Sequence, residues 1–257
     1  MVLSCISHVK RNNNNNRPDT LPYAVDISIA VDRSGSMHTM FEETKSGLRD
    51  FVNKQKDLSL KNNVPTKLTI KTFDNIVEVM PGFDATDIQN TPDISESSIT
   101  PRNTTRLIDT ACEMIIQQKN RVRQQESKIS PEAKKLGVKV LSIFALLTDG
   151  LDNESKLFNP KNLNLYLTNM QNNNGKAFFL GAGQDAITIG QVFGFCPKHS
   201  LTYTSSGIQA TNAMRAVTEN ISRAVSGNLN TEFSQLQRTN SFSNKKENKK
   251  NLLLKRC

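Results

Sequence analysis

The sequence predicts an α/β fold that is doubly wound around a mostly parallel central sheet, with one antiparallel edge strand and helices on both faces. Two observations lead to this prediction. Residues 138–147 form a nearly continuous apolar run, and residues 24–31 alternate and then become apolar, as expected of strands covered on both faces. Between and after these runs, segments with strand and helix periodicity alternate along the chain, which is typical of a parallel sheet with crossover helices.

The other elements follow from local patterns. Apolar residues at helical spacing predict helices, short apolar runs predict strands, and the turn pair Asp74-Asn75 predicts a hairpin whose second strand is the antiparallel edge strand. In order, we expect a helix over 40–57, strands over 68–73 and 76–80, helices over 107–118 and 163–170, a strand over 177–180, a helix over 186–193, an edge strand over 201–203, and a final helix over 208–225.

Polar segments flank a single predicted domain. Residues 1–20 contain the asparagine run 12–16 and are expected to be disordered, as is the basic tail over 228–257, which leaves residues 21–227 as the folded domain. No apolar run reaches the roughly eighteen residues that cross a bilayer. The first ten residues also lack the pattern of a signal peptide. The sequence therefore predicts an intracellular protein without a membrane span.

Charge and cysteine content limit the classes of function. The formal net charge is +9, but much of the excess lies in residues 245–256, and the basic stretch 119–139 is interleaved with Gln and Glu like a solvated helix. The cysteines are scattered and form no CxxC pair, so we expect free or buried thiols rather than a zinc cluster or a disulfide framework. They are Cys5, Cys112, Cys196 and Cys257.

Oxygen-bearing side chains follow the two long apolar strands. Asp32, Ser34 and Ser36 come at alternate positions after the first strand, and Asp149 follows the second. The pair Thr104-Thr105 lies in a polar loop just before a predicted helix. Ligands bind at the carboxyl ends of strands in open α/β sheets, so these loops offer carboxylate and hydroxyl oxygens at one edge of the sheet.

These motifs together resemble the metal-ion-dependent adhesion site of von Willebrand factor type A domains. The family pattern is DxSxS, then Thr, then Asp, which VDRSGSM, PRNTTRLID and TDG match in order. The stretch FFLGAGQDA also resembles microbial members, and the resemblance covers about residues 23–227. It implies Asp32, Ser34, Ser36, Thr105 and Asp149 as metal ligands; Asn103 stands where the family often has glycine, which leaves Thr104 as an alternative to Thr105.

The implied ligand set predicts the ion and the kind of partner. Hard oxygen donors favour Mg²⁺, with Mn²⁺ or Ca²⁺ as alternatives. Two carboxylates do not over-neutralise a dication, so an open coordination position can accept an aspartate or glutamate from a protein partner. Arg33, His38 and Asp152 lie close to the motif in sequence and are candidates for a rim that faces this partner.

Two other classes of function stay open. A metal-dependent hydrolase could begin with an aspartate at a strand end, but Ser34 replaces the second acid that phosphoryl transfer through aspartate needs. The sequence also has no P-loop lysine motif, GxSxG elbow or HExxH helix. Weak nucleic-acid contact through the basic tail is the other class. The low aromatic content of 6% and the absence of Trp argue against a base-stacking surface.

Overall fold

The computed structural model describes residues 21–94, 104–183, 185–205 and 207–242. The predicted disordered segment 1–20, the basic residues 243–257, Cys5 and Cys257 lie outside these ranges. Within them, Cys112 and Cys196 are free thiols. No helix in the described ranges is both long and apolar enough to span a bilayer.

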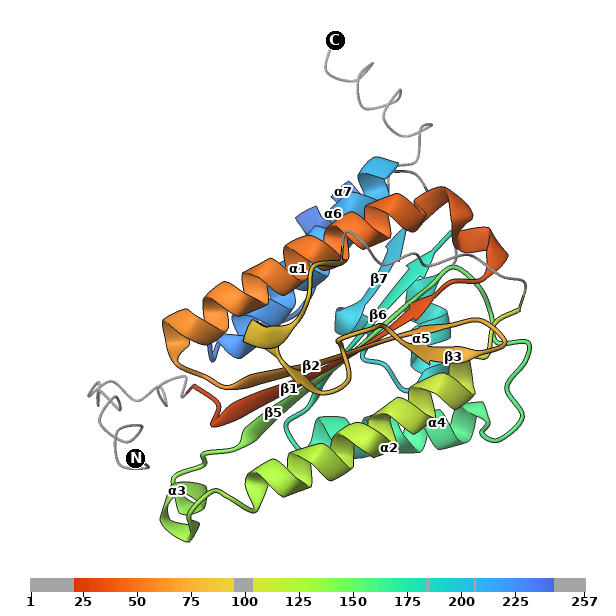
Figure 1. The fold of residues 1–257 in the computed structure, drawn as a ribbon. Coiled ribbons are helices and arrows are strands. Elements are labelled where there is room, and N and C mark those ends of the chain that lie inside the picture. Colours follow the sequence, from red (N-terminus) through yellow and green to blue (C-terminus); the bar gives the residue numbers. More distant parts are fainter. Residues whose placement is uncertain (1–20, 95–103, 184, 206, 243–257) are drawn as a thin grey trace.

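A mixed, mostly parallel sheet forms the centre of the molecule (Figure 1). Its strand order is β3-β2-β1-β5-β6-β7, and β4 pairs with β2 beside this path. The parallel members lie side by side, and β3 and β4 pair antiparallel with β2. The strands are β1 (Ala24–Asp32), β2 (Thr66–Phe73), β3 (Val77–Val79), β4 (Thr86–Asp87), β5 (Val140–Thr148), β6 (Lys176–Ala182) and β7 (Ser200–Tyr203).

Helices cover both faces of the sheet, as predicted (Figure 1). The face with α1 and α6 is opposite the face with α2, α4 and α5. The helices are α1 (Phe41–Asn62), α2 (Leu107–Glu126), α3 (Pro131–Lys135), α4 (Pro160–Asn172), α5 (Ala186–Phe193), α6 (Gly207–Val225) and α7 (Gln235–Ser241), with 3-10 turns η2 (Gly35–Met40), η3 (Ile88–Asn90) and η5 (Pro197–His199). The doubly wound α/β prediction is therefore confirmed; β4, α3 and α7 were not predicted.

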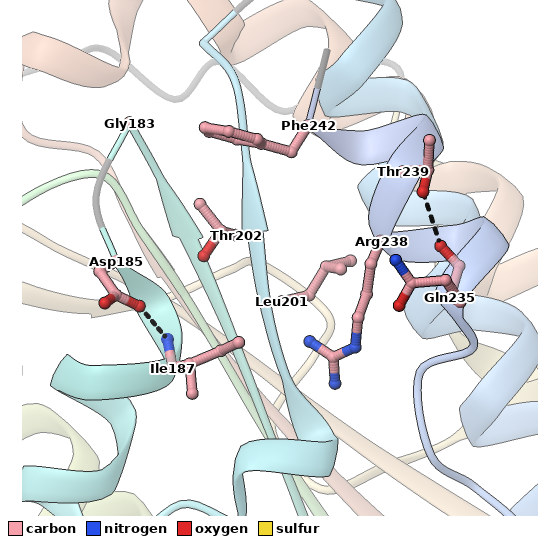
Figure 2. Close-up of a pocket in the computed structure, with 9 residues that line it drawn as sticks. All are labelled: Gly183, Asp185, Ile187, Leu201, Thr202, Gln235, Arg238, Thr239 and Phe242. Atoms are coloured by element: carbon pink, nitrogen blue, oxygen red, sulfur yellow. Dashed lines mark hydrogen bonds between the residues drawn. The ribbon is translucent and has the colours of Figure 1, made fainter. Parts of the chain in front are cut away.

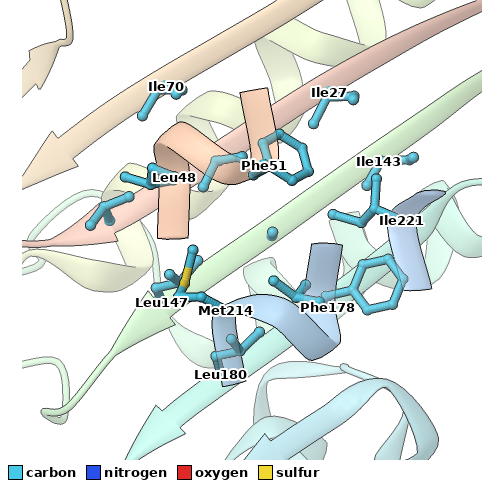
Figure 3. Close-up of a cluster of buried hydrophobic side chains, with 14 of the residues drawn as sticks. Ile27, Leu48, Phe51, Ile70, Ile143, Leu147, Phe178, Leu180, Met214 and Ile221 are labelled. Atoms are coloured by element: carbon cyan, nitrogen blue, oxygen red, sulfur yellow. The ribbon is translucent and has the colours of Figure 1, made fainter. Parts of the chain in front are cut away.

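Alternating residues of the central strands pack into different layers. Ile27 of β1 and Ile143 of β5 lie in the same large apolar cluster as Phe51 of α1 and Ile221 of α6 (Figure 3). Each of these side chains is at most 1% exposed, and burying a side chain of this size stabilises a fold by roughly 1.5–3 kcal/mol. This packing holds β1 and β5, the strands that precede two of the predicted metal loops.

The opposite face of β1 carries a buried ionic group. Asp26 is 1% exposed and accepts hydrogen bonds from Arg121 Nε at 3.0 Å and Nη2 at 2.9 Å. Gln118 and Gln125 of α2 also donate to its carboxylate. A buried carboxylate needs such partners because desolvation otherwise disfavours its charge. The network fixes α2 against the amino-terminal half of β1.

The structure corrects the predicted boundary of the carboxyl-terminal tail. Residues 228–242 are not a separate tail: α7 begins with a capping box at Ser234 and packs beside β7. Arg238 donates hydrogen bonds to three carbonyl groups in residues 197–200, and Phe233 is buried against Phe178. Composition predicted a disordered tail because the segment is rich in Asn, Ser and Gln. The segment is instead held on the domain by the helix cap and by the contacts of a few residues, such as Arg238 and Phe233.

Candidate metal centre

The predicted site lies where the sheet changes its direction of winding. β1 pairs with β2 on one side and with β5 on the other, both in parallel. Val31 is paired with Leu147, so the loops that follow β1 and β5 leave the same edge of the sheet at the same level. This arrangement is the topological switch point, where open α/β sheets bind ligands.

Asp32 is the buried base of the site. Its side chain is 0% exposed, and both carboxylate oxygens accept hydrogen bonds. Oδ1 accepts from the Ser34 amide at 2.7 Å, and Oδ2 accepts from Thr148 Oγ1 at 2.6 Å. Because Thr148 is the last residue of β5, this second bond joins the ends of the two central strands.

Ser34, Ser36 and Asp149 converge above Asp32. Ser36 Oγ donates to Asp149 Oδ1 at 2.8 Å, and Ser34 Oγ lies 3.2 Å from Ser36 Oγ and 3.5 Å from Asp149 Oδ1. Asp32 and Ser34 are buried, Asp149 is half-buried, and Ser36 is exposed. The group therefore extends from the protein interior to solvent, and its open side is at Ser36 and Asp149.

Thr105 lies beside the loop that carries Asp149. It is 4% exposed, and a β-carbon placed on Gly150 would lie 3.5 Å from its Oγ1. Its main chain is also fixed, because Thr105 N donates to Asn153 Oδ1 at 2.8 Å and Asn153 N donates to Thr105 O at 3.1 Å. The Thr105 hydroxyl thus faces the residue that follows Asp149.

Burial raises the pKa of both carboxylates of the predicted site. Burial raises the pKa of Asp32 to about 6; the hydrogen bonds from Thr148 and Ser34 lower it, and the nearby Asp149 charge raises it further. Burial also raises the pKa of Asp149, and its bonds with Ser36 and Ser34 only partly oppose this. Two desolvated like charges are costly, and a bound dication would stabilise both ionised forms.

The donor set fits a hard cation. It consists of carboxylate and hydroxyl oxygens, the ligand types that Mg²⁺, Mn²⁺ and Ca²⁺ accept. No group of three or more His, Cys, Asp or Glu side chains suited to a metal exists within the described ranges.

Two of the three predicted rim residues have structural contacts instead. Arg33 is 4% exposed; its Nε donates to Asp74 Oδ2 at 2.9 Å, and its Nη1 donates to Glu78. It therefore fixes the β2–β3 hairpin and does not face solvent. Asp152 accepts from the Ile108 amide at 3.1 Å and from Ser155 Oγ, so it caps α2.

His38 is the third rim candidate. It is exposed on η2, directly after the loop that carries Ser36. Its contact with a partner remains a prediction.

The structure adds residues that the motif did not assign. Thr148 contacts Asp32, and the buried Tyr203 lies close enough to Asp32 and Asp149 for both charges, after burial itself, to raise the pKa of its phenol. Thr148 could have been noticed because it lies between an apolar strand and Asp149. Tyr203 has no signal in the sequence, because β7 reaches the site only through the strand order of the sheet.

A separate hollow lies between α5, β7 and α7 (Figure 2). Its volume is about 580 Å³, and Arg238 and Asp185 lie on opposite sides of Thr202. Asp185 is already committed, since its carboxylate accepts from Ile187 N, Thr188 N and Thr188 Oγ1. None of the predicted metal ligands lines this hollow.

Comparisons with known proteins agree with the fold. No family model and no curated protein matches the sequence. Among solved structures, the chain is similar to proximal thread matrix protein 1 from the mussel byssus, with TM-score 0.51, 16% identity and coverage of 79% of this chain and 47% of the other, so it spans about half of that protein. It is also similar to the vWF domain of the type V pili tip protein Mfa5 from Porphyromonas gingivalis, with TM-score 0.51, 10% identity and coverage of 80% and 97%. The chain therefore folds as a von Willebrand factor A-type domain.

Proposed function

We propose that this domain binds a divalent cation, Mg²⁺ in preference to Mn²⁺ or Ca²⁺, and uses it to hold an aspartate or glutamate of a partner protein. Asp32, Ser34, Ser36, Thr105 and Asp149 are the proposed ligands, directly or through water. The observation that carries the proposal is the convergence of Ser34 Oγ and Ser36 Oγ on Asp149 Oδ1, at 3.5 and 2.8 Å.

Charge balance explains why such an ion would recognise an acidic partner. Two carboxylates balance a dication, and the hydroxyl ligands add no charge. The ion is then not over-neutralised, and a partner carboxylate could fill its open coordination position on the side where Ser36 is exposed. The cation would supply the attraction, and the protein residues would fix its position and leave the solvent side open.

Phosphoryl transfer through Asp32 lacks the second acid that this reaction needs. The position two residues later is Ser34, which cannot act as a general acid as a carboxylic acid does. Hydrolase activity is therefore a weaker alternative than binding.

Nucleic-acid binding through the basic carboxyl terminus remains the other alternative. The residues that motivate it, 245–256, lie outside the described ranges. Nucleic-acid binding through these residues predicts an affinity for nucleic acid that falls steeply as the salt concentration rises. It also predicts that this affinity is lost when the residues after Asn244 are deleted. Binding to an acidic protein through the metal instead predicts loss on chelation.

The experiment that tests the proposal first measures metal binding. It then asks whether a carboxylate can occupy the open coordination position of the bound ion. Mn²⁺ binding is measured by calorimetry and by the relaxation of water protons, which reports water on the bound ion. Acetate is then added as a minimal model of a partner carboxylate. We expect saturable Mn²⁺ binding and a decrease in proton relaxation as acetate displaces metal-bound water.

The variant Asp149→Ala provides the comparison, with circular dichroism to show that it is folded. Absence of Mn²⁺ binding by the wild-type protein would contradict the proposal. Binding without any effect of acetate would contradict the open position, and the domain would then hold a purely structural ion.

A further inference from the structure

The loop that carries Asp149 is bound to the start of α2 by a buried carboxylate. Asp109, in the first turn of α2, is 0% exposed. Its oxygens accept from the amides of Lys156 at 2.9 Å, Leu157 at 3.0 Å and Phe158 at 2.8 Å. All three donors lie in residues 149–159, which we call the β5–α4 loop. One side chain thus holds three consecutive amides of this loop.

The same loop caps the helix in return. The N-cap residue of α2, Arg106, makes no side-chain capping bond. The first-turn amides are satisfied by the loop instead, because Ile108 N donates to Asp152 Oδ1 at 3.1 Å and Asp109 N donates to Ser155 Oγ at 2.9 Å. Since unsatisfied amides at a helix start are costly when buried, helix and loop depend on each other for their hydrogen bonds.

This arrangement decides where Thr105 lies relative to Asp149. Thr105 precedes α2, is joined to Asn153 by two hydrogen bonds, and directs its hydroxyl at Gly150. Asp149 itself is held by the end of β5. The position of Thr105 therefore depends on the contact between α2 and the loop, to which Asp109 contributes the most buried carboxylate.

We propose that Asp109 is a positioning residue for the metal site, which acts by holding the β5–α4 loop on α2 so that the Thr105 hydroxyl faces the ion. The inference rests on the proposed function, because it concerns the affinity of that same site. Asp109 itself is not among the proposed ligands; its oxygens accept from backbone amides of the loop and from Arg106 Nε at 2.9 Å.

An ionised carboxylate is needed for this task. Burial alone would raise the pKa of Asp109, but the bonds from Lys156, Arg106, Phe158 and Leu157 outweigh it and hold the pKa below its ordinary value. The group thus accepts from several donors as an anion, and charge-assisted hydrogen bonds are the stronger kind. Asparagine is nearly the same size, but it would turn an NH₂ group toward amide donors.

The test compares two buried aspartates, one within α2 and one bound to α2 from β1. Asp109→Asn changes the one at the site, and Asp26→Asn changes the one paired with Arg121 in the amino-terminal half of β1. Affinity for Mn²⁺ is measured by calorimetry well below the unfolding temperature of each variant. We expect about tenfold weaker binding for Asp109→Asn, the scale of changes in residues that orient ligands, and unchanged binding for Asp26→Asn.

Two further measurements separate positioning from general stability. Amide hydrogen exchange without metal is expected to become faster at Lys156 and Phe158 in Asp109→Asn only. A double-mutant cycle with Thr105→Ala is expected to be non-additive, because Asp109 acts through Thr105. Asn153→Ala, which removes one side-chain bond to Thr105, is expected to weaken binding less than tenfold and serves if Asp109→Asn does not fold.

The outcomes distinguish this inference from the proposed function. Wild-type affinity in folded Asp109→Asn, or in folded Asn153→Ala, would overturn the inference alone. Equal losses in Asp109→Asn and Asp26→Asn would also overturn it, since the effect would then follow stability. If the wild-type protein binds no Mn²⁺, the proposed function fails and the inference fails with it.

Discussion

Ser36 Oγ lies 2.8 Å from Asp149 Oδ1, although 113 positions separate the two residues in sequence. The parallel pairing of β1 with β5 makes this contact, because the register aligns their carboxyl ends. The spacing of Asp32, Ser34 and Ser36 in one loop is local, but the site exists only once the sheet has formed. Metal affinity is therefore a property of the folded state.

Asp149→Asn should weaken Mn²⁺ binding strongly. The substitution keeps the size and one oxygen, but it removes one of the two negative charges of the site. We expect a loss of about 100-fold or more, since even residues that only orient ligands change metal affinity by 10–100-fold. Calorimetric titration at constant pH and salt measures it.

The matched control is Asp87→Asn, which removes an exposed carboxylate that caps η3. Asp87→Asn changes the net charge by the same amount as Asp149→Asn, so it reports the contribution of net charge alone to Mn²⁺ affinity. Affinity that falls equally in both variants would show that Asp149 is no ligand.

Thr105→Ala and Thr104→Ala should differ in their effect on Mn²⁺ affinity. The Thr105 hydroxyl faces Gly150 and its residue is 4% exposed, whereas Thr104 is half-buried. We expect about a tenfold loss for Thr105→Ala and little change for Thr104→Ala. The same titration distinguishes them, and the reverse order would assign the ligand to Thr104.

Most of the fold could be predicted because its central strands are long and apolar. Residues 24–31 and 138–147 were expected as strands, and β1 and β5 occupy nearly the same positions. The end of α2 at Glu126 and the short α3 were harder, since residues after 118 are polar and mostly exposed. Apolar residues no longer recur at helical spacing in this part of α2, because only one residue in several contacts the rest of the domain and some of these, such as Arg121, are polar.

The sequence indicated which residues are candidates for the site, but it did not indicate the directions of their side chains. The spacing in the loop indicated Asp32, Ser34 and Ser36. It gave no information on the direction of Arg33, whose partner Asp74 is 41 positions away. Likewise Asp152 was expected on the rim, but its carboxylate caps a helix that begins 45 positions earlier, at Leu107. Such pairings depend on tertiary structure.

Gly47→Ala should destabilise the domain at the contact between α1 and α6. A β-carbon at Gly47 would lie 2.5 Å from Met214 Cβ, so the two helices would have to separate. Alanine favours helix by about 1 kcal/mol, but overpacking of a tight contact costs about 1–3 kcal/mol. We expect a net decrease in the free energy of unfolding, measured by urea denaturation.

Ser46→Ala is the control for this substitution, because Ser46 is exposed on the same helix. It gains less helix propensity than Gly47→Ala, has no steric cost, and should change stability by less than about 0.5 kcal/mol. A Gly47→Ala protein more stable than wild type would show that α6 adjusts freely.

His199 should make the domain less stable as the pH falls below about 6.5. Burial lowers its pKa to about 4; the charges of Lys176, Lys198 and Arg238 also lower it, and Glu232 opposes them. Between these pH values the unfolded chain binds a proton that the folded protein does not, so stability rises with pH and is complete above 6.5. Because the ring is half-buried, solvent screening reduces the expected loss at pH 4 to about 1–2 kcal/mol.

The measurement compares urea unfolding at pH 7 and pH 4.5 for the wild type and His199→Phe. Phenylalanine keeps a ring against Phe178, whose centroid is 5.1 Å away, but it cannot titrate and loses the 2.9 Å bond between Nε2 and Thr231 Oγ1. The variant should therefore be less stable at pH 7, yet lose less stability on acidification than the wild type. The bond from Lys198 lowers the pKa of Glu232, the His199 charge lowers it further, and the other carboxylates are common to both proteins. The difference between the two pH dependences therefore reports His199 together with its interaction with Glu232. Identical pH dependences would show that the proton binds elsewhere.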